Sequence, residues 1–594
     1  MKQTTASRLW SFVFLAASLL IPAALANAPA VGGADAAAAR FRGTGKADPI
    51  RIENVRRTDG PVAGRSTITF DLAWDHSWRA AWNVEAEQHG GKGTIKLESW
   101  DAAWVFVKFR QGRDGQWFHA MLATNRVDHP VPAAAMLDVG MRDDGQQGAG
   151  VFVYRKVPSS GPNDFKDITL RWQHPLVVGE APFDPAKAEV RVIAIQMVRV
   201  PECAFWAGDG ATNSVMGPFS SSLTTHPFRI GSEQALALGG DAEEALVCRE
   251  MGARNPSCLE DFDLNVTQTL PAAFPKGYRA FYCMRHEITQ QQYVDFLNML
   301  PYAAQSARSG RQVSAPPGTL GIKTTDPDLG SGRLGIKIAA SGVAGGPDPV
   351  VIHRATFVAS RTRENPGKPA VYAADEPHVA CNFISHVDGS HYAAWAGLRP
   401  MSELELEKAC RGPLKPVPNE FAWGTDRIAG LGATNGAYRL RNIGKPDETI
   451  AWEGDGGPDA THGNAALMLF RGESDPKLQY CGPLRAGIFA TPTSDRVSAG
   501  ASYWGILELS GNVIERCMTV GTPAGREFMG THGDGNTIAW NDKGFCSRGG
   551  GCSRGGNAAM LVGPHRVSDR SLGIQLFHDS RKNAQGFRCV RTAP

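Results

Sequence analysis

A tight turn near the C-terminal end brings two carboxylates together and constrains how the rest of the chain can fold. Residues 508–515 are Glu-Leu-Ser-Gly-Asn-Val-Ile-Glu. This stretch therefore places two carboxylates and two candidate backbone carbonyls within one turn. Ca²⁺ takes about six to eight oxygen ligands, and such a turn can supply several of them. The alternative is a metal-free turn whose side chains bond backbone amides. Because a buried carboxylate pair without a cation is costly, the sequence favours a bound metal.

The first residues have the pattern of a secretory signal. A basic start is followed by an apolar run over residues 9–21 and by small residues ending at Ala26, after which we expect cleavage. The alternative is a membrane anchor, but this run is short for crossing a bilayer, and no later run is apolar enough to cross one. We therefore expect residues 1–26 to be a signal peptide. The mature protein would be periplasmic, at the cell surface or secreted, with no transmembrane segment. Residues 27–46 are rich in Ala and Gly and predict a flexible linker.

The next part of the chain has the pattern of an all-β domain. Short runs of alternating apolar and polar residues recur between residues 47 and 192, separated by turn residues. This spacing predicts an immunoglobulin-like β-sandwich over residues 47–192. Five tryptophans in it are expected to pack in the core, the alternative being an exposed platform for a sugar ring. They are Trp74, Trp78, Trp82, Trp100 and Trp104.

Composition narrows the class of partner. The net charge is only +3 over 594 residues, and no dense stripe of Lys and Arg accompanies it, so a nucleic-acid partner is not expected. We expect instead a protein or glycan ligand at the cell envelope, of unknown identity. Eleven cysteines permit disulfides in an exported protein, and the odd number leaves at least one without a cysteine partner.

A series of short motifs runs through the second part of the chain in a fixed order. The longest is residues 391–412, HYAAWAGLRPMSELELEKACRG, which is similar to A-x-W-x-G-x-R-L-P-T-E-A-E-W-E-Y-A-x-R-G. Shorter ones are FAWG at 421–424, GNVIER at 511–516, RGG at 548–550, RVSDR at 566–570 and GFRCVR at 586–591. Together they resemble the formylglycine-generating enzyme family, also called the sulfatase-modifying factor family. Each motif is weak alone, but their shared order over about residues 197–591 makes the resemblance specific.

The resemblance implies a fold and a role for the carboxylate turn. The fold would be an α+β, C-type-lectin-like sulfatase-modifying-factor domain with little regular secondary structure, over residues 193–594. The turn would hold calcium through the side chains of Glu508 and Glu515 and the backbone carbonyl oxygens of Gly511 and Val513. A second calcium site of the family uses an Asn side chain and its neighbour's carbonyl, for which Asn464 and Ala465 are the candidates here.

The resemblance fails at the reactive residues. Family enzymes oxidise a substrate Cys to formylglycine with O₂ and a copper ion held by two thiolates, ligands that suit Cu(I). Their two cysteines correspond here to Arg554 and Ala559, and Gly551 stands where they carry a Ser.

Other cysteines lie close to these positions. A relocated thiol site would use Cys552 and Cys546, with Ser553 and Arg554 beside them. The alternative, which the sequence favours, is a structural disulfide between Cys546 and Cys552. Copper is expected only if the relocated site exists.

At two positions where the family has disulfides, this chain keeps one cysteine of the pair and lacks the other. Cys410 and Cys589 stand at such positions, but the residues expected to pair with them are Ala393 and Val567. Either they have new partners, for which Cys283 and Cys381 are candidates, or they are buried thiols that act as small apolar groups.

An iron-binding relative of this fold uses three histidines. His386, His391 and His565 occur here, but the helical spacing of that site is not visible in the sequence. We therefore expect these histidines to be packed or solvated residues.

Fold does not fix function, and two functions remain open. The first is an exported, calcium-bound family member that acts as a binding or assembly module at the cell envelope. The second is a formylglycine-generating oxidase that converts a sulfatase Cys to formylglycine with the relocated thiols.

Overall fold

The computed structural model describes residues 33–594, apart from short stretches within that range. The stretches not described are residues 61–63, 113–114, 180, 222–225, 249–259, 264, 325–331, 346–366, 430–437, 453–459, 466–468, 472–478, 536–539, 552–561 and 573–579. The signal peptide expected at residues 1–26 lies outside the described residues.

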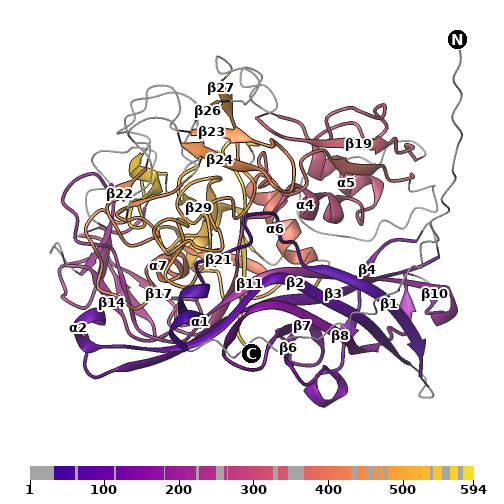
Figure 1. The fold of residues 1–594 in the computed structure, drawn as a ribbon, viewed down its shortest axis with the longest axis horizontal. Coiled ribbons are helices and arrows are strands. Elements are labelled where there is room, and N and C mark those ends of the chain that lie inside the picture. Colours follow the sequence, from indigo (N-terminus) through magenta and orange to yellow (C-terminus); the bar gives the residue numbers. More distant parts are fainter. Residues whose placement is uncertain are drawn as a thin grey trace, which may run out of the picture.

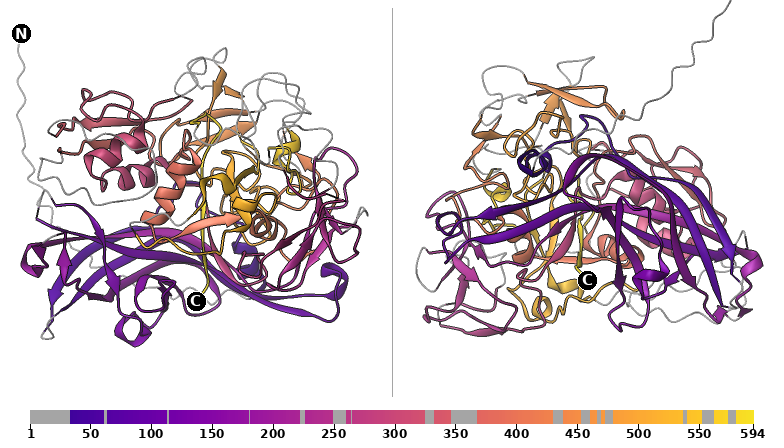
Figure 2. Two further views of the ribbon diagram at one scale, coloured as in Figure 1. Left: turned by 180° about the vertical axis from the view of Figure 1, so that it is seen from behind. Right: turned by 60° about the horizontal axis from the view of Figure 1, so that its bottom comes forward.

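The chain is mostly β, with few and short helices (Figure 1). The N-terminal strands form a curved layer beneath the rest of the chain (Figure 2). They are β1 (Arg51–Asp59), β2 (Arg65–Val84), β3 (Ile95–Gln111), β4 (Phe118–His119), β5 (Met121–Leu122), β6 (Ala135–Met141), β7 (Gly148–Arg155), β8 (Ser159–Gln173) and β11 (Ala188–Val200), with a small separate hairpin of β9 (Val177–Val178) and β10 (Ala181–Pro182).

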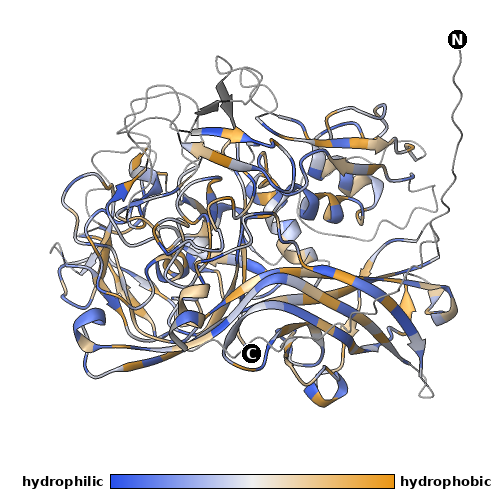
Figure 3. Cartoon of the chain, viewed as in Figure 1, coloured by the Kyte–Doolittle hydropathy of each residue, from blue (hydrophilic) through white to orange (hydrophobic). Residues whose placement is uncertain are grey.

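The two longest strands organise this layer. β2 pairs with β1 and β8, while its last residues pair with the start of β3 across a hairpin that contains helix α2 (Ala86–His89). β3 then pairs with β7 and β11. The long strands carry alternating hydrophobic and hydrophilic residues (Figure 3). Alternate side chains of a strand share one face, and the buried faces of β2 and β3 meet in one apolar core.

The five tryptophans pack in the interior. Trp74, Trp78 and Trp104 are fully buried, and Trp100 is buried. Trp82 is half-buried, donates a hydrogen bond to the Tyr503 hydroxyl at 2.7 Å and is covered by the guanidinium of Arg40. The expected packing of these tryptophans in the core is therefore confirmed, and they do not form an exposed platform for a sugar ring.

The N-terminal strands and the second part of the chain share one 14-stranded sheet. Strand β11 pairs with β3 along its length and then with β18 (Phe281–Met284) through its last residues. The boundary expected between residues 192 and 193 therefore falls inside β11. From β18 the sheet continues through β30 (Cys589–Thr592), β21 (Arg399–Ser402), β28 (Glu515–Met518) and β29 (Phe545–Arg548).

Short helices with capping boxes flank this sheet in the second part. Thr289 caps α4 (Gln290–Leu297), Ser385 caps α6 (His386–Trp395) and Ser402 caps α7 (Glu403–Arg411); each also has an N3 side chain bonded back to the cap. The remaining helices are α5 (Tyr302–Ser309) and α8 (Pro523–Arg526).

Small sheets lie around this centre. They are β12 (Phe205–Ala207) with β14 (Phe228–Ile230); β13 (Phe219–Ser221), β16 (Leu246–Cys248), β15 (Leu236–Leu238) and β17 (Gln268–Leu270); β19 (Ile336–Ala340) with β20 (Val371–Ala374); β22 (Arg427–Ile428) with β25 (His462–Gly463); and β24 (Thr449–Trp452), β23 (Tyr438–Arg441), β26 (Leu469–Arg471) and β27 (Gln479–Cys481).

The segment expected to be a flexible linker, residues 27–46, differs from that expectation where it is described. It forms helix α1 (Gly33–Ala39), whose Ala36 and Ala39 are buried in a core shared with β2 and the second part. Downstream, the N–H of Gly43 bonds the Thr491 carbonyl at 3.1 Å. The alanines act as small packing residues, which a composition rich in Ala and Gly does not distinguish from a linker.

No helix among the described residues combines the length and apolar character needed to cross a membrane.

Candidate functional site: a buried carboxylate cluster beside strands β28 and β29

The turn at residues 508–515 is held by backbone N–H groups of a neighbouring segment. Glu508 and Asn512 both have left-handed backbone, with φ of 59° and 63°, which is unusual for a Glu and signals a constrained position. The Glu508 carboxylate accepts the Gly487 N–H at 2.6 Å, and the Asn512 side-chain oxygen accepts the Leu484 N–H at 2.8 Å. The turn is therefore tied to the segment before it by its side chains.

A third glutamate, which the sequence did not single out, completes the cluster. Glu287 follows β18 and is fully buried, like Glu515, while Glu508 is 7% exposed. The Asn512 side-chain N–H reaches Glu287 at 3.4 Å. The carboxyl groups of Glu287 and Glu508 contact each other. Two carboxyl groups can bond in this way only when a proton or a cation lies between them.

One arginine lies against two of the three carboxylates. The guanidinium of Arg588, in the GFRCVR motif, donates to the Glu515 carboxylate at 2.7 Å and lies 3.7 Å from that of Glu287. Its other N–H groups bond the carbonyls of Met284 and Leu507 at 2.9 and 2.8 Å. The two motifs at 511–516 and 586–591 therefore meet as a buried ion pair.

Burial makes negative charge on the three carboxyl groups of the cluster unfavourable. Burial raises the pKa of Glu287 well above its usual value, and Glu508 adds to the effect. Burial also raises the pKa of Glu508 and of Glu515, although Arg588 opposes both shifts. One oxygen of each of the three carboxylates accepts no hydrogen bond from a donor of the protein. These oxygens are of the type that Ca²⁺ binds, but the three carboxylates are not by themselves arranged as a metal-holding set, so a cation here would also need backbone carbonyl ligands.

The weaker calcium candidates lie elsewhere, beside residues 497–500. Asn464 is 8% exposed, and its side-chain N–H donates to the Ser498 carbonyl at 2.6 Å. Its side-chain oxygen is buried and has no hydrogen-bond partner. Ala465 packs in a small apolar core with Phe421 and Trp423. Within the described residues, no set of three or more His, Cys, Asp and Glu side chains is arranged to hold a metal, although this count includes neither Asn side chains nor backbone carbonyls.

The residues expected to carry the chemistry are only partly described. Cys552, Ser553 and Arg554 lie outside the described residues, as does Ala559. Gly551 precedes them. A Cβ atom at Gly551 would lie 2.8 Å from the Ala584 carbonyl oxygen and 2.9 Å from the Ile514 nitrogen, so a serine does not fit there without backbone movement.

Cys546 lies on β29 directly opposite Cys517 of β28. Both thiols are free and buried in an apolar cluster with other cysteines. Burial raises the pKa of Cys546 and of Cys517 far above the usual thiol value. Cys546 is therefore a free thiol in its less reactive, protonated form, and Cys552, the disulfide partner expected for it, lies outside the described residues.

The two cysteines at family disulfide positions are buried thiols and have not formed disulfides with new partners. Cys410 and Cys589 carry free, buried thiols, as do Cys283 and Cys381. All four pack in apolar surroundings and act as small apolar side chains.

A second buried network unites three of the sequence motifs. Glu403, at the start of α7, bonds Arg548 at 2.9 Å and Arg570 at 2.8 Å. It also accepts the Val520 N–H at 2.9 Å. Burial alone would raise the pKa of Glu403, but Arg570 and Arg548 outweigh it and lower that pKa to about 2. The arginines of RGG and RVSDR are thus structural partners of α7.

The histidines do not gather. His386 and His391 both lie on α6; His386 packs against the Phe545 ring with centroids 5.4 Å apart, and His565 lies in a separate turn. Burial lowers the pKa of His391 to about 3. The burial of His386 and His565 and the lowered pKa of His391 agree with the expectation of packed residues.

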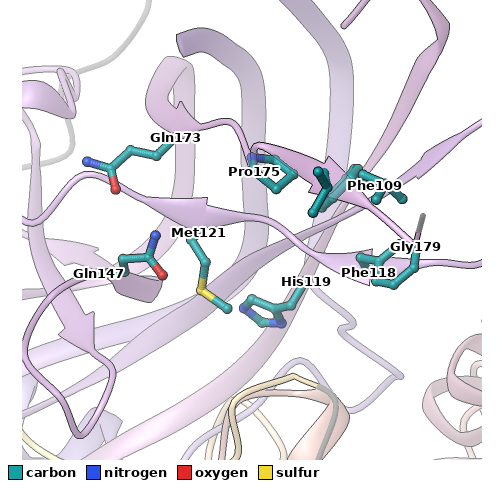
Figure 4. A pocket seen from close by; sticks show the side chains of 10 residues that line it. Phe109, Phe118, His119, Met121, Gln147, Gln173, Pro175 and Gly179 are labelled. Atoms are coloured by element: carbon teal, nitrogen blue, oxygen red, sulfur yellow. The ribbon is translucent and has the colours of Figure 1, made fainter. Parts of the chain in front are cut away.

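A hollow of about 230 Å³ lies apart from this site, in the N-terminal strands. Gln147 and Gln173 face each other at one end, and Phe109 and Phe118 lie at the other (Figure 4). The rest of its lining is His119, Met121, Pro175, Val177, Val178 and Gly179. His119 is the one side chain among these lining residues that can carry a charge. The clusters of buried charged side chains in the described chain therefore lie outside this hollow.

Comparison with known proteins identifies the domain that carries the two networks. Residues 250–593 match the model of the family described as "Sulfatase-modifying factor enzyme 1-like domain". The chain belongs to the sulfatase-modifying factor family. Its carboxylate cluster, β28–β29 and α7 all lie in the matched region, whereas β1 to β11 precede it.

One curated relative is hercynine oxygenase from Mycobacterium tuberculosis (strain ATCC 25618 / H37Rv), 37% identical to this chain over 82 residues. The matched stretch is 14% of this chain and 19% of the relative. The similarity therefore concerns a small part of each of the two chains.

Proposed function

We propose that this protein is an exported member of the sulfatase-modifying factor family that acts as a binding or assembly module at the cell envelope, without the family's cysteine-oxidising activity. One observation carries the proposal: Arg554 and Ala559 stand where the resemblance places the two copper-binding cysteines. The lack of room for a serine at Gly551 supports it, and so does the burial of Cys517 and Cys546 in an apolar cluster.

The proposal extends to the finer architecture and the compartment. Residues 47–192 would be an immunoglobulin-like sandwich, supported by the core between β2 and β3. Residues 193–594 would be a C-type-lectin-like domain. The signal pattern over residues 1–26 supports export to the periplasm, the cell surface or the medium.

The direct test is a peptide assay. We expect that the protein, incubated with copper, O₂ and a Cys-x-Pro-x-Arg peptide, leaves the peptide thiol intact by mass spectrometry and thiol titration. A family enzyme that carries both cysteines is the positive control. Aldehyde formation by this protein would overturn the proposal.

The second candidate function, oxidation by relocated thiols, rests on Cys546 and Cys552, which lie near the expected positions. If aldehyde appears, the variants Cys546→Ser and Cys552→Ser show which of the two thiols the reaction needs. Loss of aldehyde in either variant would assign the reaction to that thiol, and the copper site with it.

We also propose a structural calcium ion at Glu508, Gly511, Val513 and Glu515, supported by the unpartnered carboxylate oxygens. Chelation by EGTA at pH 7.5 is expected to lower the midpoint of thermal unfolding, and calcium but not magnesium is expected to restore it, because Ca²⁺ tolerates irregular oxygen geometry. The variant Asp144→Asn, at an exposed carboxylate of the N-terminal strands, should retain this response. An unfolding midpoint that does not change with EGTA would contradict the calcium site.

A further inference from the structure

Strand β28 carries a buried arginine that forms no ion pair with any carboxylate of the described residues. Arg516 is 6% exposed and lies opposite Ser547 of β29. Side chains opposite each other in an antiparallel pair share a face, so this face also holds the next pair, Met518 and Phe545. Both of these are apolar and belong to the core on that side. The carboxylate of Glu515 and the thiols of Cys517 and Cys546 alternate with Arg516 and Ser547 along the strands, on the other face.

The hydrogen bonds of Arg516 leave one edge of its guanidinium without partners. Its Nη1 donates to the Ser547 hydroxyl. Its Nε and Nη2 are both buried and donate to no group of the protein. Several other buried arginines of the described chain lack a partner for Nε alone, and Arg516 is the one that lacks two.

In other arginines of this protein, the same two atoms, Nε and Nη2, donate hydrogen bonds to a carboxylate. Arg110 holds Glu189 through Nε and Nη2, at 2.8 and 2.6 Å. Arg581 holds Asp388 through the same two atoms, at 2.8 and 2.9 Å. This fork matches the spacing of two oxygens in a carboxylate, sulfate or phosphate.

No acidic side chain of the described residues forms an ion pair with Arg516. An unpaired charge in an apolar interior is strongly unfavourable, and an anion with its own hydrogen-bonding oxygens relieves that cost. The Ser547 hydroxyl accepts from Arg516 and so keeps its own O–H to donate, which adds a third donor at the same place.

We propose that Arg516 and Ser547 form a binding site for a small oxyanion, either a carboxylate or a tetrahedral anion such as sulfate, held by the Nε and Nη2 fork. The site adjoins the segment that carries the reactive cysteines in family enzymes, because Ser547 lies four residues before Gly551. The proposal does not depend on whether the protein oxidises cysteine or binds calcium, since it rests on the unpartnered donors alone.

The test measures unfolding midpoints of the full chain in sodium formate, sodium sulfate and sodium chloride at equal ionic strength. We expect a saturable rise in one or both oxyanion arms over chloride, because a ligand that binds only the folded state stabilises it. A rise in formate alone assigns a carboxylate ligand, and a rise in sulfate alone assigns a tetrahedral one.

Variants tie the effect to the fork. Arg516→Met should weaken the binding of the anion by about thirtyfold or more, which is the expected result of removing one partner of a buried charge contact. Arg516→Lys keeps the charge but loses the fork, and should bind more weakly than the wild type. Arg110→Met, whose fork already holds Glu189, should leave the anion response unchanged.

A second measurement does not depend on the variants. Crystals grown with selenate or soaked in formate should show the anion within hydrogen-bond distance of Nε and Nη2 of Arg516. The proposal would be overturned if chloride changed the unfolding midpoint as much as both oxyanions do. It would also be overturned if Arg516→Met and the wild type responded equally to the oxyanions. A crystal structure with Nε and Nη2 bonded to another part of the chain would overturn it as well.

Discussion

Replacing Arg588 with Met is expected to lower the free energy of unfolding by about 3 to 5 kcal/mol. The guanidinium is fully buried between Glu515 and Glu287 and also bonds two backbone carbonyls. Met keeps much of the volume but leaves the carboxylates without their cation. Urea unfolding, followed by tryptophan fluorescence, measures the change.

A double variant separates charge from packing in this prediction. Adding Glu515→Gln to Arg588→Met removes one of the stranded charges, so the double variant should be more stable than the sum of the two single effects predicts. Arg56→Met is the matched control, because its partner Asp167 and Arg56 itself are exposed. That control should change stability by less than about 1 kcal/mol. Equal effects of Arg588→Met and Arg56→Met would show that the cluster does not stabilise the fold.

Replacing Glu403 with Gln is expected to cost about 3 to 5 kcal/mol at neutral pH. The carboxylate is fully buried and neutralises Arg548 and Arg570 at once. Gln preserves the size but removes the charge and turns one acceptor into a donor facing a guanidinium. Both arginines keep other partners, Glu407 and Glu260, so we expect destabilisation rather than loss of the fold.

The pH dependence of this effect has a defined sign. The pKa of Glu403 is about 2 in the folded protein, below the usual 4.5. A carboxyl with a lowered pKa stabilises the fold fully above pH 4.5 and loses that contribution as the pH falls toward 2. The full contribution is about 3 kcal/mol. The difference in stability between the wild type and Glu403→Gln should therefore shrink as the pH falls from 6 to 3.5.

The control for Glu403 is Glu98→Gln, whose ion pair with Arg79 is 40% exposed on the Glu side. It should change stability by less than about 1 kcal/mol at any pH in this range. A difference between the wild type and Glu403→Gln that stays constant from pH 6 to 3.5 would contradict the ionised state of Glu403.

Local patterns predicted many elements of the second part correctly. A Ser or Thr followed three residues later by Glu or Gln is the sequence pattern of a capping box, and Thr289 and Ser402 both form one. These elements depend on residues a few positions apart, where side-chain chemistry acts directly on the backbone. The order of the short motifs likewise predicted the family that the comparison confirmed. The alternation in β2 predicted a strand, because one of its faces is mostly buried, whereas β3 is buried on both faces over most of its length.

Long-range pairings were beyond the sequence. Nothing in residues 188–200 indicates that β11 would pair with both β3 and β18 and so carry one sheet across the expected boundary. Glu287 was missed as a member of the cluster because it is distant in sequence from residues 508–515, and only the fold brings it to Arg588. The composition of residues 27–46 likewise did not reveal that α1 packs on a core.

The sequence by itself determined the family, the carboxylate turn and the replacement of the reactive cysteines by Arg554 and Ala559, because each is a matter of residue identity and order. Only the tertiary structure decided the state of these groups. It placed Arg588 against Glu515, kept Cys546 a buried thiol and left two N–H groups of Arg516 without partners. The physical reason is that charge compensation and desolvation depend on which groups meet in space, and sequence neighbours do not specify those meetings.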